Sequence, residues 1–446
     1  MFTYFFNVLS SIDTFFWGYI GFAMIIFLGC YFTFYTGFFQ IRVLPSIFRT
    51  FMHFLRSPSE KEMGTHPIKV FFASVGGMIG VGNVVGIVTA LQLGGPGALL
   101  WVWVAAFAGT LIKYSEIYLG LKYRMPNQNK GFDGGPMFFL KKAFKTKWIS
   151  VAIAFLLCIY GAEVYQFTVI VDTVSQNWHV NRLLVMGILL GLVLYAGIGG
   201  VPRVAKICSW VMPVFVVSYI AMCIWVIGHY LPMLPNLLMT VFQSAFTGHA
   251  AIGGFLGSTA LLAIQNGMAG ACYSADIGIG YDSIIQSESH TIYPERQARM
   301  AILGVLIDNL VCTMSVLVVL VTGIWQSPNH YEGSFLVQAA LESYFPYMFI
   351  IMPFFILVLG YTTLISYFTV GLKCASYLHP TRGPSIYLGY AAFVLIFFSF
   401  FDQTQVLLLM RIAGALLLMV NLAGIYRLRN EIEFVLDTPA VLVEVK

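Results

Sequence analysis

Charged residues are scarce in this sequence. Only 10% of the 446 residues are Asp, Glu, Lys or Arg, whereas 59% are hydrophobic, and the mean hydropathy is +0.84. A soluble domain carries roughly 25% charged residues, because its surface must be solvated by water. Apolar stretches longer than about 18 residues recur along most of the chain, and this length is typical of a membrane span. The composition therefore excludes a soluble enzyme, a nucleic-acid-binding protein and a disordered chain.

Two further features are missing. No Lys or Arg precedes Arg42, so the start of the chain lacks the basic region of a signal peptide and is expected to be retained. The seven cysteines show no CxxC spacing and lie in or beside apolar segments. We interpret them as small hydrophobic residues.

Eleven segments are candidate membrane spans, because a spanning helix needs about 20 apolar residues. They are approximately residues 14–37, 67–93, 98–121, 148–174, 183–198, 208–228, 252–280, 298–324, 347–378, 386–401 and 406–428. An odd number of spans places the two termini on opposite sides of the membrane.

The distribution of Lys and Arg predicts the orientation. With these spans, all but three of the 24 basic residues fall on one side, the exceptions being Lys113, Arg182 and Arg411. Short cytoplasmic loops retain basic residues. We therefore predict a multi-pass protein of the cell membrane, the inner membrane in a bacterium, with the N-terminus outside and the C-terminus in the cytoplasm.

Two predicted spans are interrupted by glycine. Span 67–93 contains FFASVGGMIGVGNVVG, with five glycines among eleven residues, and span 252–280 contains GMAGACYSADIGIG. Each glycine costs about 1 kcal/mol relative to alanine in a helix interior, and an unwound turn needs partners for its backbone groups. Close packing of helices through small residues is the alternative interpretation of the first run.

The positions of the two interruptions favour a transport site. Without span 14–37, ten core helices remain, and the interrupted ones are the first and the sixth. Paired interruptions at matching positions of two halves indicate the binding site of a secondary transporter. Because each half has five helices, the second half is inverted. Half-helix N-termini attract a carboxylate, and freed carbonyls bind a small cation, so a substrate with a carboxylate is expected.

The predicted organisation follows from this repeat. Residues 1–66 form an extra N-terminal transmembrane helix and a cytoplasmic loop. Residues 67–230 form the first five-helix repeat, 231–430 the second, inverted repeat, and 431–446 a cytoplasmic tail.

Several motifs carry a resemblance to a known family. They are GVGNVVGIVTA (80–90), LGGPGALLWVW (93–103), KYSEIYLGLKYR (113–124), GGPMFFL (134–140) and PERQARMAILGVLIDNLVCTMSVLVVLVTG (294–323). With them the chain resembles the alanine or glycine:cation symporter family. The resemblance implies an all-α leucine-transporter-type fold, a five-plus-five inverted repeat with one extra N-terminal helix. It also implies symport of a small neutral amino acid with Na⁺, or H⁺ in some members, by alternating access, with no organic cofactor.

The resemblance also implies site residues. A sodium site would use carbonyls near Gly76 and Ile79 and the hydroxyls of Thr362 and Thr363. The alternative for these hydroxyls is bonding to their own helix. The implied substrate contacts are Gly80, Val81, Gly82, Asn83, Gln166, Tyr273, Ser274, Thr363 and Tyr367, with the turn of the sixth core helix at Tyr273–Ser274.

One departure from the family pattern lies in the sixth core helix. The usual run is phenylalanine-serine-asparagine-glutamate-alanine-glycine, and here the residues are YSADIG (273–278). The acid is one methylene shorter and the amide is lost. The substrate is therefore either alanine or glycine or, as an alternative, a different amino acid. A further alternative is an uncoupled carrier or a channel on the same scaffold.

Isolated charges inside spans are functional candidates by default. Lys113 and Glu116 are three residues apart, which predicts a local ion pair. Asp276 has two interpretations, orienting the unwound backbone or accepting a proton. Glu163, three residues before Gln166, either lines the pathway or makes an interhelical hydrogen bond. Arg411 lies near the outer boundary, where snorkelling accounts for it.

Overall fold

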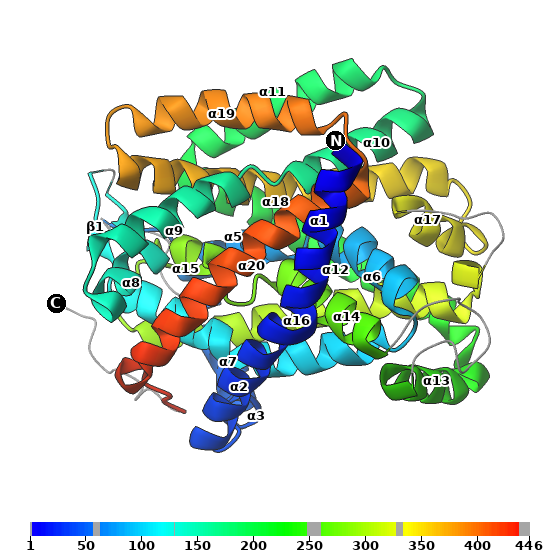
Figure 1. Cartoon of the computed structure of the whole chain (residues 1–446), viewed down its shortest axis with the longest axis horizontal. Coiled ribbons are helices and arrows are strands. Elements are labelled where there is room, and N and C mark those ends of the chain that lie inside the picture. The colour runs from blue at the N-terminus through cyan, green and yellow to red at the C-terminus, as the bar shows by residue number, and fades with distance from the viewer. Residues whose placement is uncertain (1, 57–62, 129, 248–259, 327–332, 437–446) are drawn as a thin grey trace.

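The computed structural model describes residues 2–56, 63–128, 130–247, 260–326 and 333–436 and is almost entirely helical (Figure 1). The first half of the described chain contains α1 (Phe2–Phe15), η1 (Phe16–Gly21), α2 (Phe22–Tyr35), α3 (Phe39–Arg42), α4 (Leu44–Arg56), α5 (Pro67–Met78), η2 (Gly82–Gly86), α6 (Ile87–Gly94), α7 (Ala98–Lys122), β1 (Met125–Pro126), β2 (Phe132–Asp133), α8 (Pro136–Phe144), α9 (Lys147–Tyr160), α10 (Val164–Trp178), α11 (Arg182–Ile198) and α12 (Gly200–Gly228). The second half contains η3 (Leu231–Met233), α13 (Leu234–Thr247), α14 (Ala260–Ala275), α15 (Tyr281–Gln286), α16 (Pro294–Val321), η5 (Ile324–Gln326), α17 (Ser334–Glu342), α18 (Met348–Leu378), α19 (Gly383–Phe398), α20 (Gln403–Arg427) and η6 (Arg429–Glu431).

Seven helices in the described ranges are long and apolar enough to cross a membrane, and the bent pair Pro67–Met78 and Gly82–Gly94 makes up to eight. The shorter apolar helices α11 and α19 match two more predicted spans and lie side by side at the top of Figure 1. The start of predicted span 252–280 and the end of predicted tail 431–446 lie outside the described residues. The count of eleven spans stays a prediction.

The N-terminal helix is longer than predicted. The segments α1, η1 and α2 follow one another as one span, Tyr4–Tyr35, which begins well before residue 14. It runs along the outside of the helix bundle (Figure 1). At Gly29 an added Cβ would lie 2.6 Å from Ala108 Cβ, so two small residues allow α2 to approach α7 closely.

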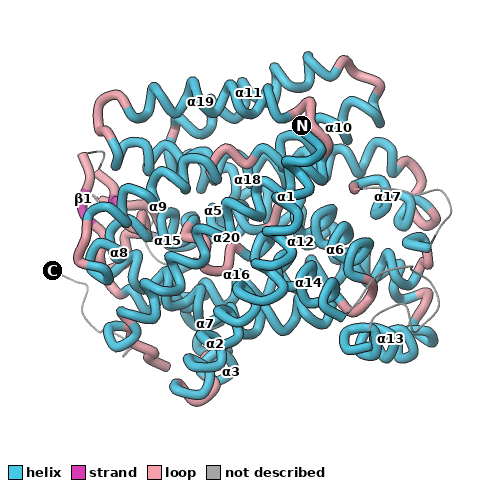
Figure 2. The backbone as a smooth tube through the Cα atoms, viewed as in Figure 1, coloured by secondary structure: helices cyan, strands magenta, loops and turns pink. Residues whose placement is uncertain are grey.

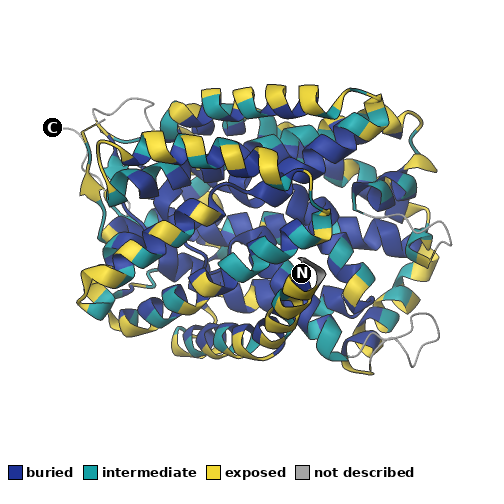
Figure 3. Cartoon of the chain, turned by 45° about the horizontal axis from the view of Figure 1, so that its top comes forward, coloured by how far each residue is buried: buried dark blue, intermediate teal, exposed yellow. Residues whose placement is uncertain are grey.

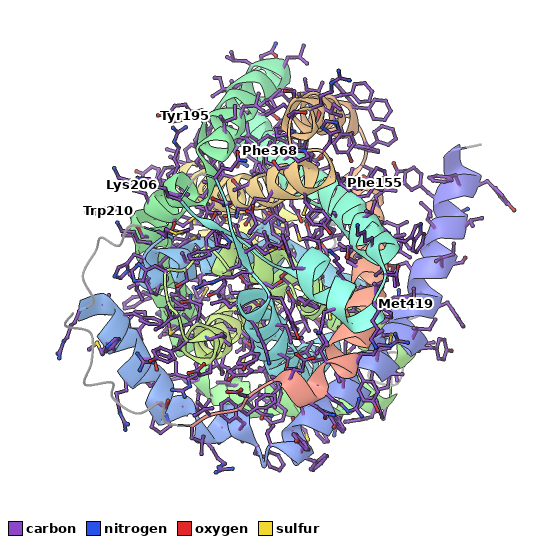
Figure 4. All side chains as sticks on the ribbon, turned by 90° about the vertical axis from the view of Figure 1, so that its left-hand side faces the viewer. Phe155, Tyr195, Lys206, Trp210, Phe368 and Met419 are labelled. Atoms are coloured by element: carbon purple, nitrogen blue, oxygen red, sulfur yellow. The ribbon has the colours of Figure 1, made fainter. Side chains whose placement is uncertain are left out.

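The interior is formed by α7, α14 and α16, with α5 and α18 packed beside them. Figure 3 shows buried residues through the centre and exposed ones on the outer helices. Side chains that point outward, such as Phe155, Tyr195 and Trp210 in Figure 4, are large and apolar and 59–78% exposed, whereas Phe368 is buried. Large exposed apolar surfaces are expected where lipid, not water, surrounds the protein.

Sequence analysis missed a third interruption, in predicted span 148–174. The helix stops at Tyr160 and restarts at Val164, and Glu163 has φ 47°, in the left-handed region. Helices make up most of the described chain (Figure 2), and the described strands form one two-stranded antiparallel hairpin, β1 with β2.

Candidate functional site

The first interruption lies between α5 and η2. The helix ends at Met78, Ile79 takes an extended conformation (φ −80°, ψ 90°), and the chain resumes as the π-helical turn η2. The two arms are bent by 44°. The glycine-rich run therefore breaks its helix, as its composition predicts.

The second interruption lies between α14 and α15. Helix α14 runs through Tyr273 and Ser274 to Ala275, so the turn predicted at Tyr273–Ser274 was wrong. The break begins at Asp276, where φ is 51°, and includes Gly278 (71°) and Gly280 (110°). Asp tolerates the left-handed region better than most residues, and glycine enters it freely. These residues unwind the chain after the predicted turn.

Predicted substrate residues gather at the first break. Val81 N–H donates to Gln166 Oε1 at 2.8 Å, and Gly80 N–H donates to Asn83 Oδ1 at 3.0 Å. An added Cβ at Gly80 would lie 2.3 Å from Thr363 Oγ1, and one at Gly82 would lie 3.2 Å from the Tyr273 ring. The structure thus brings α10, α14 and α18 against the unwound backbone of the first core helix.

Of the two predicted sodium-site hydroxyls, one faces this break. Thr363 Oγ1 lies 3.1 Å from the Gly76 carbonyl oxygen and 3.2 Å from that of Leu359. Thr362 Oγ1 lies 2.8 Å from the Leu359 carbonyl and 3.5 Å from Met212 Sδ on α12. In this conformation the Thr362 hydroxyl therefore bonds to its own helix.

A buried carboxylate links the two interrupted helices. Asp308 of α16 accepts from Asn83 Nδ2 at 2.5 Å and from Ser274 Oγ at 3.3 Å. Asp308 is 2% exposed. Neither partner is visible from sequence spacing, because Asn83 and Ser274 are 225 and 34 residues from Asp308 along the chain.

Glu163 and Tyr367 both contact the sixth core helix. Glu163 precedes α10 and accepts from the Tyr273 hydroxyl at 2.8 Å, which is the interhelical hydrogen bond among its two interpretations. The Tyr367 hydroxyl donates to Asp276 Oδ1 at 3.1 Å, and its ring stacks on Tyr281 with centroids 4.0 Å apart. Tyr367 therefore contacts the second break.

Lys113 is bound to the second break, and its predicted local ion pair with Glu116 was wrong. Its Nζ lies 2.7 Å from the Ala275 carbonyl oxygen and 2.9 Å from that of Asp276. It also lies 3.1 Å from one carboxylate oxygen of Asp276 and 3.1 Å from one of Asp282. The lysine and both aspartates have no exposed side-chain surface. Sequence analysis missed Asp282, whose signal was only a second acid six residues after Asp276.

Arg411 is more than a snorkelling side chain, so that prediction was also wrong. It forms an ion pair with Asp13 of α1 at 2.8 Å, donates to Asn266 Oδ1 at 3.2 Å, and has a side chain only 10% exposed. It lines a pocket between the two interrupted helices and α20, formed by Gly86, Thr89, Ala90, Leu93, Asn266, Ala269, Gly270, Tyr273, Leu407 and Arg411.

Two interrupted helices linked through Asp308, with backbone groups, hydroxyls and amides around the first break, are typical of the leucine-transporter-type fold. The fold is similar to a solved manganese transporter of Eremococcus coleocola in a mutant form, with TM-score 0.50 and 13% identity, covering 79% of this chain and 75% of that one.

The chain belongs to the sodium:alanine symporter family, whose model matches residues 3–438. It is 28% identical to an uncharacterized transporter of Haemophilus influenzae, over 96% of this chain and 94% of the relative. It is also 28% identical to the sodium/alanine symporter AgcS of Methanococcus maripaludis, covering 88% of each chain. The probable sodium/glutamine symporter GlnT of Bacillus subtilis is 28% identical as well, over 95% of this chain and 88% of that one. The family and these relatives are transporters, not enzymes.

Proposed function

We propose that this protein is a Na⁺-coupled symporter of a small neutral amino acid, such as alanine or glycine, working by alternating access. The observation that carries the proposal is the first break, where backbone donors and acceptors face Gln166 and Thr363. Cation-coupled amino-acid symport is supported by the family and its relatives. Their substrates differ, so the particular amino acid is part of the proposal.

The geometry of the first break supports carboxylate binding. Side-chain oxygens of Gln166 and Asn83 accept from the N–H groups of Val81 and Gly80. A substrate carboxylate presents two acceptor oxygens of the same kind, and half-helix N-termini favour the added negative charge. We therefore assign the substrate carboxylate to the turn Gly80–Asn83. There it would replace the side-chain oxygens of Gln166 and Asn83 as acceptor, and these two side chains would then be able to bind other polar groups of the substrate.

The packing around this turn favours a small side chain. The Thr363 hydroxyl lies 2.3 Å from the position of a Cβ added at Gly80. The Tyr273 ring lies 3.2 Å from that of a Cβ added at Gly82. Ser274 of α14 lies beside the Tyr273 ring, with its Cα 3.8 Å from the position of a Cβ added at Gly82. A large substrate side chain needs these elements to move apart.

The sodium site is proposed between α5 and α18. Hard cations prefer several carbonyl and hydroxyl oxygens. The Gly76 carbonyl and Thr363 hydroxyl are already 3.1 Å apart, and Ile79 lies at the end of the same unwound turn. Thr362 would join only after its hydroxyl rotates away from Leu359.

We also propose the orientation and the organisation predicted from the basic residues and the repeat. The N-terminus lies outside and the C-terminus in the cytoplasm of the cell membrane. The two repeats are residues 67–230 and 231–430.

Uptake into proteoliposomes tests the function. A panel of labelled L- and D-amino acids is offered with Na⁺ and pH gradients imposed separately. We expect an inward Na⁺ gradient to drive saturable accumulation of small neutral amino acids. A flux that rises linearly with substrate concentration and does not change with the Na⁺ or pH gradient would instead show a channel or an uncoupled carrier.

Substitution Thr363→Ala tests the sodium site. Loss of one oxygen that faces Gly76 is expected to raise the Na⁺ concentration for half-maximal uptake about tenfold, the scale of one hydrogen bond or ligand to a charged group. Thr369→Ala is the matched control, since this buried hydroxyl on the same helix bonds to the Ile365 carbonyl at 2.7 Å. Equal Na⁺ dependence in both variants would contradict the proposed site.

A further inference from the structure

The Lys113 cluster, defined as Lys113, Glu116, Asp276 and Asp282, lies at the second break with no described role in sodium or substrate binding. An ammonium has three N–H donors. Four oxygens, from Ala275, Asp276 and Asp282, already lie 2.7–3.1 Å from Lys113 Nζ. The lysine therefore has no donor left for a further carboxylate in this conformation.

Two carboxyls of the cluster, Glu116 and Asp282, accept no hydrogen bond within the described residues, but Asp282 forms an ion pair with Lys113 and Glu116 forms none there. Glu116 lies three residues from Lys113 on α7 and is 0% exposed. Neither carboxyl oxygen has a hydrogen-bond partner within the described part of the chain. The charged groups that act on it are Asp276, Lys113 and Asp282, and Ser283 of α15 lies beside it. Two of these three charges repel an ionised carboxylate.

The charge balance of the cluster favours a protonated Glu116. Three carboxylates against one ammonium would leave two negative charges in a site without exposed surface. Burying an unpaired charge is strongly unfavourable, and such a group takes up or loses a proton instead. Asp276 and Asp282 share the lysine, so Glu116 is the carboxyl of the cluster that is left without a cation.

We infer that the Lys113 cluster is a proton-binding site coupled to movement of the second break, an inference that rests on the proposed transport function. The ligand is H⁺ and its carrier is Glu116. When the break moves away from α7, Lys113 loses the oxygens of Asp276 and Asp282. Its ammonium then pairs with Glu116, three residues along the same helix, and the Glu116 O–H bond breaks. The proton leaves to water on the side to which the site is open.

The sign of the effect follows from linkage. The conformation described here holds the Glu116 proton, and the alternative releases it, so low pH stabilises this conformation and high pH stabilises the other. Transport that cycles between the two must therefore depend on pH and must move protons.

The pH profile of Glu116→Gln tests this inference, because glutamine imitates the protonated acid. We expect the rate of Na⁺-driven uptake by the unaltered protein to change by up to about tenfold per pH unit where Glu116 titrates. The variant is expected to vary less than about twofold over the same range. Glu431→Gln is the matched control, since Glu431 pairs with Lys122 of the same α7 at 3.7 Å but is 35% exposed. A Glu116→Gln profile as steep as that of the control overturns the inference.

A second measurement needs no variant. Adding Na⁺ and the transported amino acid to the purified protein in weakly buffered detergent is expected to change the pH of the solution, through binding or release of the Glu116 proton. Saturable Na⁺-driven uptake without any proton movement would overturn the inference and leave the proposed symport intact. Absence of any gradient-driven uptake would instead overturn the proposed function itself.

Discussion

Lys113→Met is expected to destabilise the folded protein by about 3–5 kcal/mol and to abolish uptake. Removing one partner of a buried ion pair leaves the other partner charged and unpaired, and here Asp276 and Asp282 would both lose their cation. The variant also loses the bonds that fix the carbonyls of Ala275 and Asp276 in the second break. Thermal unfolding in detergent and uptake into proteoliposomes measure the two effects.

A matched control for this variant lies on the same helix. Lys122→Met removes a lysine that is 33% exposed and pairs with an equally exposed Glu431. Its expected effect on stability is within about 0.5 kcal/mol. The triple variant Lys113→Met, Asp276→Asn, Asp282→Asn removes the cation together with both of its partners and should recover part of the stability. If Lys113→Met unfolds at the temperature of the unaltered protein, the buried pairs do not stabilise the break.

Local patterns in the sequence predicted two of the broken helices, because each glycine weakens the helix at its own position. The run around Gly80 breaks its helix as predicted. The break after α14 was placed too early: Ser274 stays helical and bonds to Asp308, and the left-handed positions Gly278 and Gly280 lie after it. The interruption before Val164 was missed because only one glycine, Gly161, marks it.

Ionic partners were the least predictable part of the site. Sequence spacing reveals only neighbours on one helix, such as Lys113 and Glu116. The actual partner Asp276 is 163 residues from Lys113, and Asn83 is 225 residues from Asp308. In a low-dielectric interior, a charge is stabilised by whichever opposite charge the fold brings within reach. Only the packing of α7 against α14 and α15 identifies these partners.

These long-range bonds tie the two breaks into one unit. Asn83 in the first break and Ser274 beside the second both donate to Asp308. Tyr367, on the helix that carries Thr363, donates to Asp276. A displacement at one break therefore changes hydrogen bonds that hold the other.

Gly80→Ala is expected to reduce uptake on the order of 100-fold, the scale associated with displacing a positioned group by about 1 Å. An added Cβ would lie 2.3 Å from Thr363 Oγ1 and 3.0 Å from the Gln166 amide, so α18 or α10 must retreat from the break. The retreat separates Thr363 from Gly76 and Gln166 from Val81, which affects the proposed sodium and carboxylate sites together. Uptake rates at saturating Na⁺ and amino acid, with folding checked by size-exclusion chromatography, measure the effect.

Gly86→Ala provides the control within the same interrupted helix. The nearest side-chain atom to an added Cβ at Gly86 is the Tyr165 hydroxyl oxygen at 3.9 Å, an ordinary contact distance. Both substitutions replace a buried glycine by alanine in the first core helix, so a general effect on helix flexibility would lower uptake in both. Because the close approach exists at Gly80 and not at Gly86, we expect Gly86→Ala to retain uptake within about twofold to threefold. Equal losses in the two variants would show that flexibility of the break, not the contact with Thr363 and Gln166, requires glycine at position 80.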